Sequence, residues 1–193
     1  MFQKHRKLII TLAVIFAIPV LILLCCDISV RKVDENEETE TETVVETVDP
    51  LDASALELFD TGKGLTIKMS SEMKEEKAGD FSVYYFAEGL MVSVKKVPFE
   101  ELKEAGTLDA DSSIEDYVQM VEEANENIAF KTDSYGNLST TYEASDDKVD
   151  MIYYATVRKG SDAFWMINCS GLLEEQDIRI PQFELWGSTI SVQ

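Results

Sequence analysis

The sequence predicts an α+β fold, an antiparallel β-sheet packed with helices, preceded by one transmembrane helix and an acidic linker. Three observations lead to this prediction. The 193-residue chain begins with a long uncharged apolar run, continues with an acidic segment, and ends with short β-branched and aromatic runs around an amphipathic helix. Strands, a helix, further antiparallel strands and a closing helix are the element order of an α+β sandwich.

A permanent membrane anchor is predicted at residues 8–26. These 19 residues carry no charge, and a helix of that length rises about 28 Å, close to the hydrocarbon thickness of a bilayer. A cleaved secretory signal has a shorter apolar region followed by small residues, whereas bulky residues follow here. Lipidation at Cys25 or Cys26 stays open, although Leu24 stands where a lipoprotein signal has a small residue.

The charges beside the anchor predict its orientation. Residues 1–7 carry a slight excess of basic side chains over the other flank, which favours a cytoplasmic amino terminus. No second apolar span follows Lys32, so residues 33–193 are expected outside the cytoplasm. We therefore expect a single-pass protein of the cell membrane with an extracellular domain.

Residues 27–60 are predicted to form an acidic, disordered linker. The part from Val33 to Asp60 holds eleven Asp or Glu and no Lys or Arg. Its Glu-Thr repeats repel one another and offer little apolar surface to bury, so a tether that holds the domain off the membrane is expected. A tail that collects cations or binds a partner is the alternative, although the spaced ligands of a calcium loop are absent.

Residues 61–193 have a usual length for one domain with its own core. They hold 12 Lys or Arg against 25 Asp or Glu, a net charge of −13. Nucleic-acid binding needs clustered positive charge and is therefore not expected. A protein or peptide partner of this domain is expected to be basic.

Short apolar runs between Gly or charged turns predict the strands of the domain. Turn signals separate the later ones, at residues 135–137 and 159–162. The predicted strands cover residues 64–69, 81–86, 90–97, 127–133, 138–145, 149–159 and 163–170.

Two helices are predicted in the domain. The first covers residues 112–127, has apolar residues at helical spacing, and begins with a capping box of Ser112 and Glu115. The second closes the domain over residues 180–190. It is expected to have a proline in its first turn and three inward-facing apolar residues, namely Pro181, Phe183, Trp186 and Ile190.

Several stretches of the domain share a pattern of core and turn residues with a known superfamily. They are GLTIKMSSEMKEE (64–76), SIEDYVQMVEEANENI (113–128), VDMIYYATVRKGSDAFWMINCSG (149–171) and IPQFELWGSTISV (180–192). Together they resemble the PsbP-like α/β/α-sandwich superfamily, which includes PsbP proteins, a Ran-binding import factor and DcrB-type lipoproteins. The chain also resembles small membrane-anchored proteins of Gram-positive anaerobes. The resemblance implies a sheet sandwiched by helices and a role in binding proteins or ions.

Residues for common catalytic chemistries are scarce in the domain. The single histidine, His5, lies in the cytoplasmic flank, so no His-dependent nucleophile and no His-containing zinc site is expected. Cys169 is expected in the core, with a reactive thiol as the alternative. Gly62–Gly64 lacks the spacing of a phosphate-binding loop. We expect neither enzyme activity nor a cofactor.

Asp146, Asp147 and Asp150 form the densest group of carboxylates in the domain. A solvated hairpin tip is the expected structure of this group. A weak calcium or other cation site is the alternative.

Tyr154, Phe164 and Trp165 are the candidate partner-binding residues. They belong to two neighbouring aromatic pairs, Tyr153–Tyr154 and Phe164–Trp165, on adjacent predicted strands. Because successive side chains of a strand point to opposite faces, one member of each pair is expected in the core and the other outward. The outward rings would suit a protein or peptide partner.

Three classes of function remain open. A membrane-tethered extracytoplasmic binding or scaffold module is the expected one, because catalytic groups are scarce and the resemblance implies binding. An extracytoplasmic ligand or cation sensor is the first alternative. A hydrolase that uses carboxylates alone is the second, and it needs two facing Asp or Glu about 5–10 Å apart across a cleft.

Overall fold

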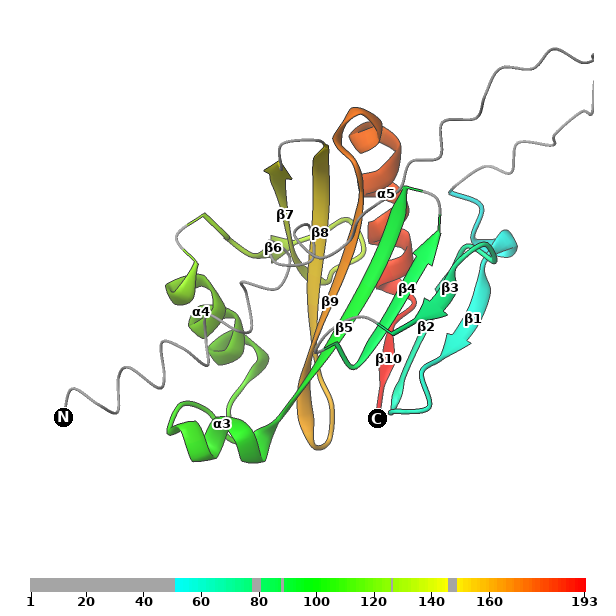
Figure 1. Cartoon of the computed structure of the whole chain (residues 1–193). Coiled ribbons are helices and arrows are strands. Elements are labelled where there is room, and N and C mark those ends of the chain that lie inside the picture. Colours follow the sequence, from blue (N-terminus) through cyan, green and yellow to red (C-terminus); the bar gives the residue numbers. More distant parts are fainter. Residues whose placement is uncertain (1–50, 78–80, 88, 126, 146–148) are drawn as a thin grey trace, which may run out of the picture.

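The computed structural model describes residues 51–77, 81–87, 89–125, 127–145 and 149–193 (Figure 1). The predicted cytoplasmic flank, the anchor and the linker up to residue 50 lie outside the described residues. Among the helices that are described, none is long and apolar enough to cross a membrane. The membrane topology therefore stays a prediction.

In the described part of the chain, seven antiparallel strands form a central sheet in the order β3-β4-β5-β9-β8-β7-β6 (Figure 1). Most predicted strands are confirmed, but the run 127–133 forms a strand at only two residues. The bounds are β3 Lys74–Glu76, β4 Val83–Ala87, β5 Leu90–Pro98, β6 Lys131–Thr132, β7 Leu138–Ser145, β8 Asp150–Lys159 and β9 Ala163–Leu172.

A smaller sheet has the order β1-β2-β10 and consists of β1 (Glu57–Asp60), β2 (Leu65–Met69) and β10 (Ser191–Val192). β1 belongs to the segment predicted as a disordered linker, so the boundary predicted at residue 61 is wrong. The physical reason is Phe59, whose ring meets that of Tyr85 edge to face with 5.4 Å between the centroids. This ring, with the partly buried Leu56 before it, holds an otherwise acidic strand against the core.

One face of the central sheet is covered by the small sheet and by α5 (Gln176–Ser188) (Figure 1). The core between them includes Ile67 from β2, Trp165 from β9 and Trp186 from α5, all fully buried. These large side chains exclude water from this face of the central strands.

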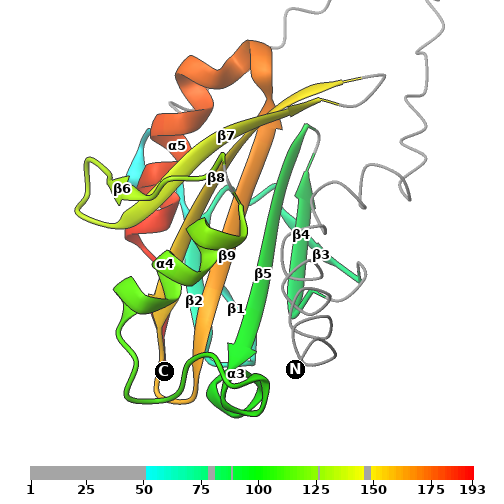
Figure 2. The ribbon, with the colours of Figure 1, turned by 90° about the vertical axis from the view of Figure 1, so that its left-hand side faces the viewer.

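The opposite face carries α3 (Phe99–Ala105) and α4 (Ile114–Ala124). In Figure 2, α4 lies in front of the sheet and α3 lies below it, at the end of β5. The ring of Phe164 stacks on that of Tyr117 at 4.5 Å between centroids and meets the edge of Phe99 at 5.1 Å. The described fold is therefore α+β, with an antiparallel sheet that has helices on both faces.

The first predicted helix is confirmed as α4, but its capping box is shifted by one residue. The hydroxyl of Ser113 accepts a hydrogen bond from the Asp116 N–H at 3.1 Å, and the Asp116 carboxylate accepts one from the Ser113 N–H at 2.7 Å. The predicted pair of Ser112 and Glu115 is therefore wrong. Ser112 accepts from the N–H of Asp109 instead, at 3.0 Å, and so stabilises the preceding loop.

The closing helix, α5, begins before its predicted start because a 3-10 turn, η2 (Leu173–Glu175), leads directly into it. Pro181 consequently lies inside the helix rather than in its first turn. Ile190 lies beyond the helix end, although it still packs partly buried against the core. The inward positions of Phe183 and Trp186 are confirmed.

Candidate functional site

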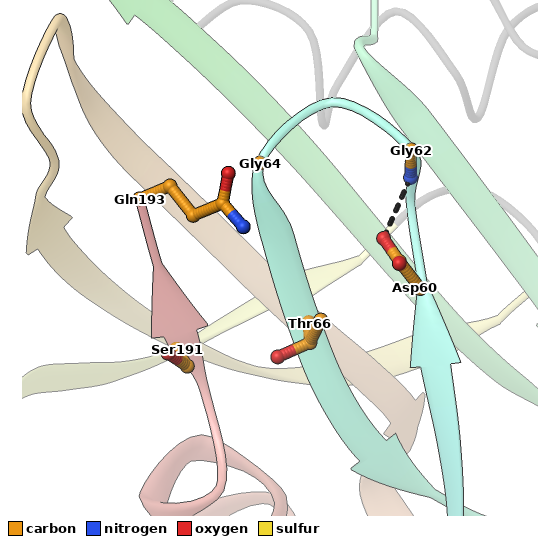
Figure 3. A pocket seen from close by; sticks show the side chains of 6 residues that line it. All are labelled: Asp60, Gly62, Gly64, Thr66, Ser191 and Gln193. Atoms are coloured by element: carbon orange, nitrogen blue, oxygen red, sulfur yellow. Dashed lines mark hydrogen bonds between the residues drawn. The ribbon is translucent and has the colours of Figure 1, made fainter.

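A polar pocket of about 240 Å³ lies at the turn between β1 and β2 (Figure 3). Thr66 alternates along β2 with the buried Leu65 and Ile67, so its side chain points to the outer face of the small sheet. The lining residues are small or polar, and we call the site that they form the β1–β2 pocket: Asp60, Gly62, Gly64, Thr66, Ser191 and Gln193.

Three of the lining side chains form a row across the small sheet. Asp60 on β1 lies directly opposite Thr66 on β2, and Thr66 lies directly opposite Ser191 on β10. Directly opposed residues of antiparallel strands place their Cβ atoms about 4.5–5.5 Å apart. One carboxylate and two hydroxyl groups therefore share one side of the pocket.

The tight β1–β2 turn shapes the mouth of the pocket. The backbone N–H of Thr61 donates to the carbonyl oxygen of Leu65 at 3.1 Å, and the Thr61 hydroxyl donates to the same oxygen at 2.9 Å. Gly62 and Gly64 have φ angles of 64° and 97°, which strain other residues. The Gln193 N–H donates to the Gly64 carbonyl at 2.9 Å, which fixes the strand that follows α5 against this turn.

Asp60 gives the pocket its negative charge. One carboxylate oxygen, Oδ1, accepts from the Gly62 N–H at 2.9 Å, which leaves Oδ2 available to a ligand. The neighbouring cation, Lys63, donates its ammonium group to the carbonyl oxygen of Ser82 instead. Among the described residues, Asp60 makes no ion pair.

Sequence reasoning missed this pocket. Gly62–Gly64 lacks the spacing of a phosphate-binding loop, but Asp-Thr-Gly-Lys-Gly between two apolar runs is a signal for a tight turn. No local pattern could show that Ser191 and Gln193, far along the chain, would complete the site. That juxtaposition arises from the pairing of β10 with β2.

The aromatic candidates Tyr154, Phe164 and Trp165 are fully buried, so the expectation that one ring of each pair points outward is wrong. Side chains of β9 do alternate between faces, but each face is covered. Phe164 contacts α4 through Tyr117, whereas Trp165 belongs to the core beneath the small sheet and α5. None of the three can form a partner-binding surface in this fold.

Of the three carboxylate candidates, only Asp150 belongs to the described residues. Asp146 and Asp147 lie outside the described residues, and Asp150 is exposed at the first position of β8. Within the described ranges, no group of three or more His, Cys, Asp or Glu side chains is arranged to hold a metal ion. The cation-site alternative at this hairpin stays a prediction.

Cys169 is buried in the core as expected. Burial raises the pKa of its thiol, because the thiolate would lose its hydration. The side chain acts as a small apolar residue of β9.

A polar network joins the sheet, α5 and the β6–β7 turn. The hydroxyl of Tyr154 donates to the carboxylate of Asp133 at 2.8 Å, and the side-chain amide of Asn137 donates to the same carboxylate at 3.1 Å. Arg158 donates to the carbonyl oxygen of Gly187 at 2.8 Å and to the side-chain oxygen of Asn137. Tyr154 is thus a structural residue, because its hydroxyl group makes a hydrogen bond inside the fold.

The stability of the protein is expected to depend on the ionisation of Asp133. Burial raises the pKa of this carboxyl, but hydrogen bonds from Asn137, Tyr154 and Tyr135 outweigh burial and hold the pKa below its ordinary value of 3.8. A lowered folded-state pKa stabilises the fold above the unfolded-state value, and this stabilisation is lost as the pH falls through the folded-state value. Below about pH 4, the wild type should therefore lose more stability than Asp133→Asn.

Urea unfolding of the full chain in detergent micelles, measured from pH 6 to pH 2.5, tests this expectation. Asp150→Asn removes an exposed carboxylate and is the matched control, which should follow the wild type. Equal losses in the wild type and in Asp133→Asn would contradict the assigned role of the carboxylate.

No protein-family model matches the chain, and no curated protein matches it either. Among solved structures, the chain is similar to cyanobacterial PsbP (CyanoP) from Synechocystis sp. PCC 6803, with 12% sequence identity and a TM-score of 0.45. The match covers 72% of this chain and 93% of that one. The chain is also similar to the Ran-binding protein Mog1p from Saccharomyces cerevisiae, with 11% identity, coverage of 71% and 95%, and a TM-score of 0.47.

A third similar structure, from Bacteroides thetaiotaomicron VPI-5482, shows 10% identity and a TM-score of 0.47. The match covers 72% of this chain but only 49% of that one. The resemblance to membrane-anchored proteins of Gram-positive anaerobes stays a prediction. Two of these similar structures are a PsbP protein and a Ran-binding protein, which are among the groups named in the predicted resemblance, and membership of the PsbP-like superfamily stays a prediction.

Proposed function

We propose that the chain is a membrane-tethered extracytoplasmic module that binds a basic partner. The observation that carries the binding role is the β1–β2 pocket, in which the carboxylate of Asp60, without an ion pair in the described part of the chain, lies beside oxygen-bearing side chains. The excess of acidic residues over the whole domain adds a long-range attraction for cationic partners.

The tether rests on the sequence. Residues 8–26 are uncharged and long enough to span a bilayer, and the acidic segment after them separates the domain from the anionic membrane surface. In this arrangement the module presents its pocket to soluble or cell-surface partners outside the cytoplasm.

One experiment tests both parts. Lys68 is exposed on β2, and Lys68→Cys provides a labelling site on the sheet that carries the pocket. A membrane-impermeant maleimide with a photoreactive group should label this cysteine on intact cells, because the domain lies outside. Illumination should then yield a discrete crosslinked partner.

Glu104→Cys, exposed on α3, is the matched control and should be labelled without the same adduct. The chain's own cysteines interfere little, since Cys169 is buried and the other two lie in the predicted anchor. Labelling only after cell lysis would contradict the location. Labelling without a specific adduct would contradict the binding role.

A further inference from the structure

We propose that the β1–β2 pocket binds a primary ammonium group, as presented by a lysine side chain of a basic peptide. The inference deepens the proposed function and rests on it, because it names the chemistry by which the module would recognise a partner. It follows from the row of Asp60, Thr66 and Ser191 beside the side chain of Gln193 (Figure 3).

The donors of an ammonium group match the acceptors of this row. An ammonium group has three N–H donors and no acceptor. The Oδ2 atom of Asp60 and the hydroxyl oxygen of Ser191 are acceptors on either side of the Thr66 hydroxyl, and the Cβ atoms of each outer residue lie about 5 Å from that of Thr66. In the described part of the chain, neither hydroxyl makes a hydrogen bond, and the side-chain amide of Gln193 makes none either.

Asp60 supplies the negative charge needed to hold a cation, and within the described ranges no cationic side chain forms an ion pair with it. The nearest cation along the chain, Lys63, donates to the carbonyl oxygen of Ser82 and leaves Asp60 to the pocket. None of the described residues that line the pocket is cationic, so an anion would meet the negative charge of Asp60 without a compensating positive charge. An anionic ligand is therefore disfavoured.

The size of the pocket favours the end of a side chain over a bare metal ion. A volume of about 240 Å³ corresponds to about eight water molecules at roughly 30 Å³ each, which is more room than one ion needs. Calcium takes six to eight oxygen ligands, usually from several carboxylates, whereas this lining supplies one carboxylate. An open surface also surrounds Gly62, where an added Cβ would meet nothing within 4 Å.

Binding is tested with N-acetyl-Gly-Lys-Gly-amide added to the 15N-labelled full chain in detergent micelles. The NMR signals of the Gly64 amide and of the Gln193 side-chain amide should shift in a saturable way. The same peptide with an acetylated lysine side chain should produce no shift, because it lacks the charge and two of the donors. Calcium chloride is titrated in parallel.

Asp60→Asn should weaken peptide binding about three- to fivefold, the range expected for a solvent-accessible charge pair. Glu57→Gln removes a charge from the same strand outside the pocket and should leave binding unchanged. The proposal is overturned if the acetylated peptide shifts the same signals, if Asp60→Asn binds as the wild type does, or if calcium alone shifts them. Because the crosslinking above does not depend on this peptide, failure of the ammonium site leaves the binding role separately testable.

Discussion

Phe164→Ala is expected to destabilise the protein by about 3–5 kcal/mol, the range for truncating a buried phenylalanine. The ring is fully buried and lies between Tyr117, at 4.5 Å, and Phe99, at 5.1 Å. Its removal would leave a cavity between the sheet and both helices on that face. Since domains are stable by only about 5–15 kcal/mol, this loss is a large fraction of the total.

Urea unfolding of the full chain in detergent micelles, followed by tryptophan fluorescence, measures the effect. Tyr135→Ala is the control, because this ring is 51% exposed and its truncation should change the stability by less than about 0.5 kcal/mol. If Phe164→Ala unfolds like the wild type and instead abolishes capture of the crosslinked partner, the ring is part of a binding surface after all.

The error over Phe164 and Trp165 shows what strand patterns can and cannot predict. The alternation of side chains was correctly expected, and β7 and β9 start at the predicted residues. What the sequence could not show is that α4 covers one face of β9 and α5 the other. Burial of both members of an adjacent pair requires two covered faces, which is a property of the tertiary arrangement.

The prediction that the domain starts at residue 61 is wrong because it rests on the acidic composition of the preceding segment. The eleven acidic residues between 33 and 60 favour an extended chain, and this pattern obscured β1. Phe59 and the preceding Leu56, both partly buried against the core, supply the apolar contacts that hold β1 beside β2. The β1–β2 pocket could not be predicted either, because Asp60 comes from this strand. Ser191 and Gln193, which complete the lining, follow about 130 residues later in the sequence.

The contact between Gly187 and Tyr154 predicts the second large effect. A Cβ at position 187 would lie 2.5 Å from the Tyr154 hydroxyl oxygen and 3.2 Å from its ring. The ring cannot move aside freely, since it is fully buried and its hydroxyl donates to Asp133 at 2.8 Å. Gly187→Ala is therefore expected to lose about 1–3 kcal/mol by overpacking, although alanine alone would favour the helix by about 0.5–1 kcal/mol.

A double-mutant cycle identifies the source of this loss. Tyr154→Phe removes the hydroxyl oxygen and with it the 2.5 Å contact, so Gly187→Ala should be less destabilising in that background than in the wild type. Ile178→Ala, on the same helix and 53% exposed, should change stability little in either background. If Gly187→Ala loses as much with phenylalanine at position 154 as with tyrosine, the hydroxyl is not what limits the approach of α5. Partial rescue would instead show that the hydroxyl of Tyr154, whose ring the sequence offers as a candidate for partner contact, limits how closely α5 packs on the sheet.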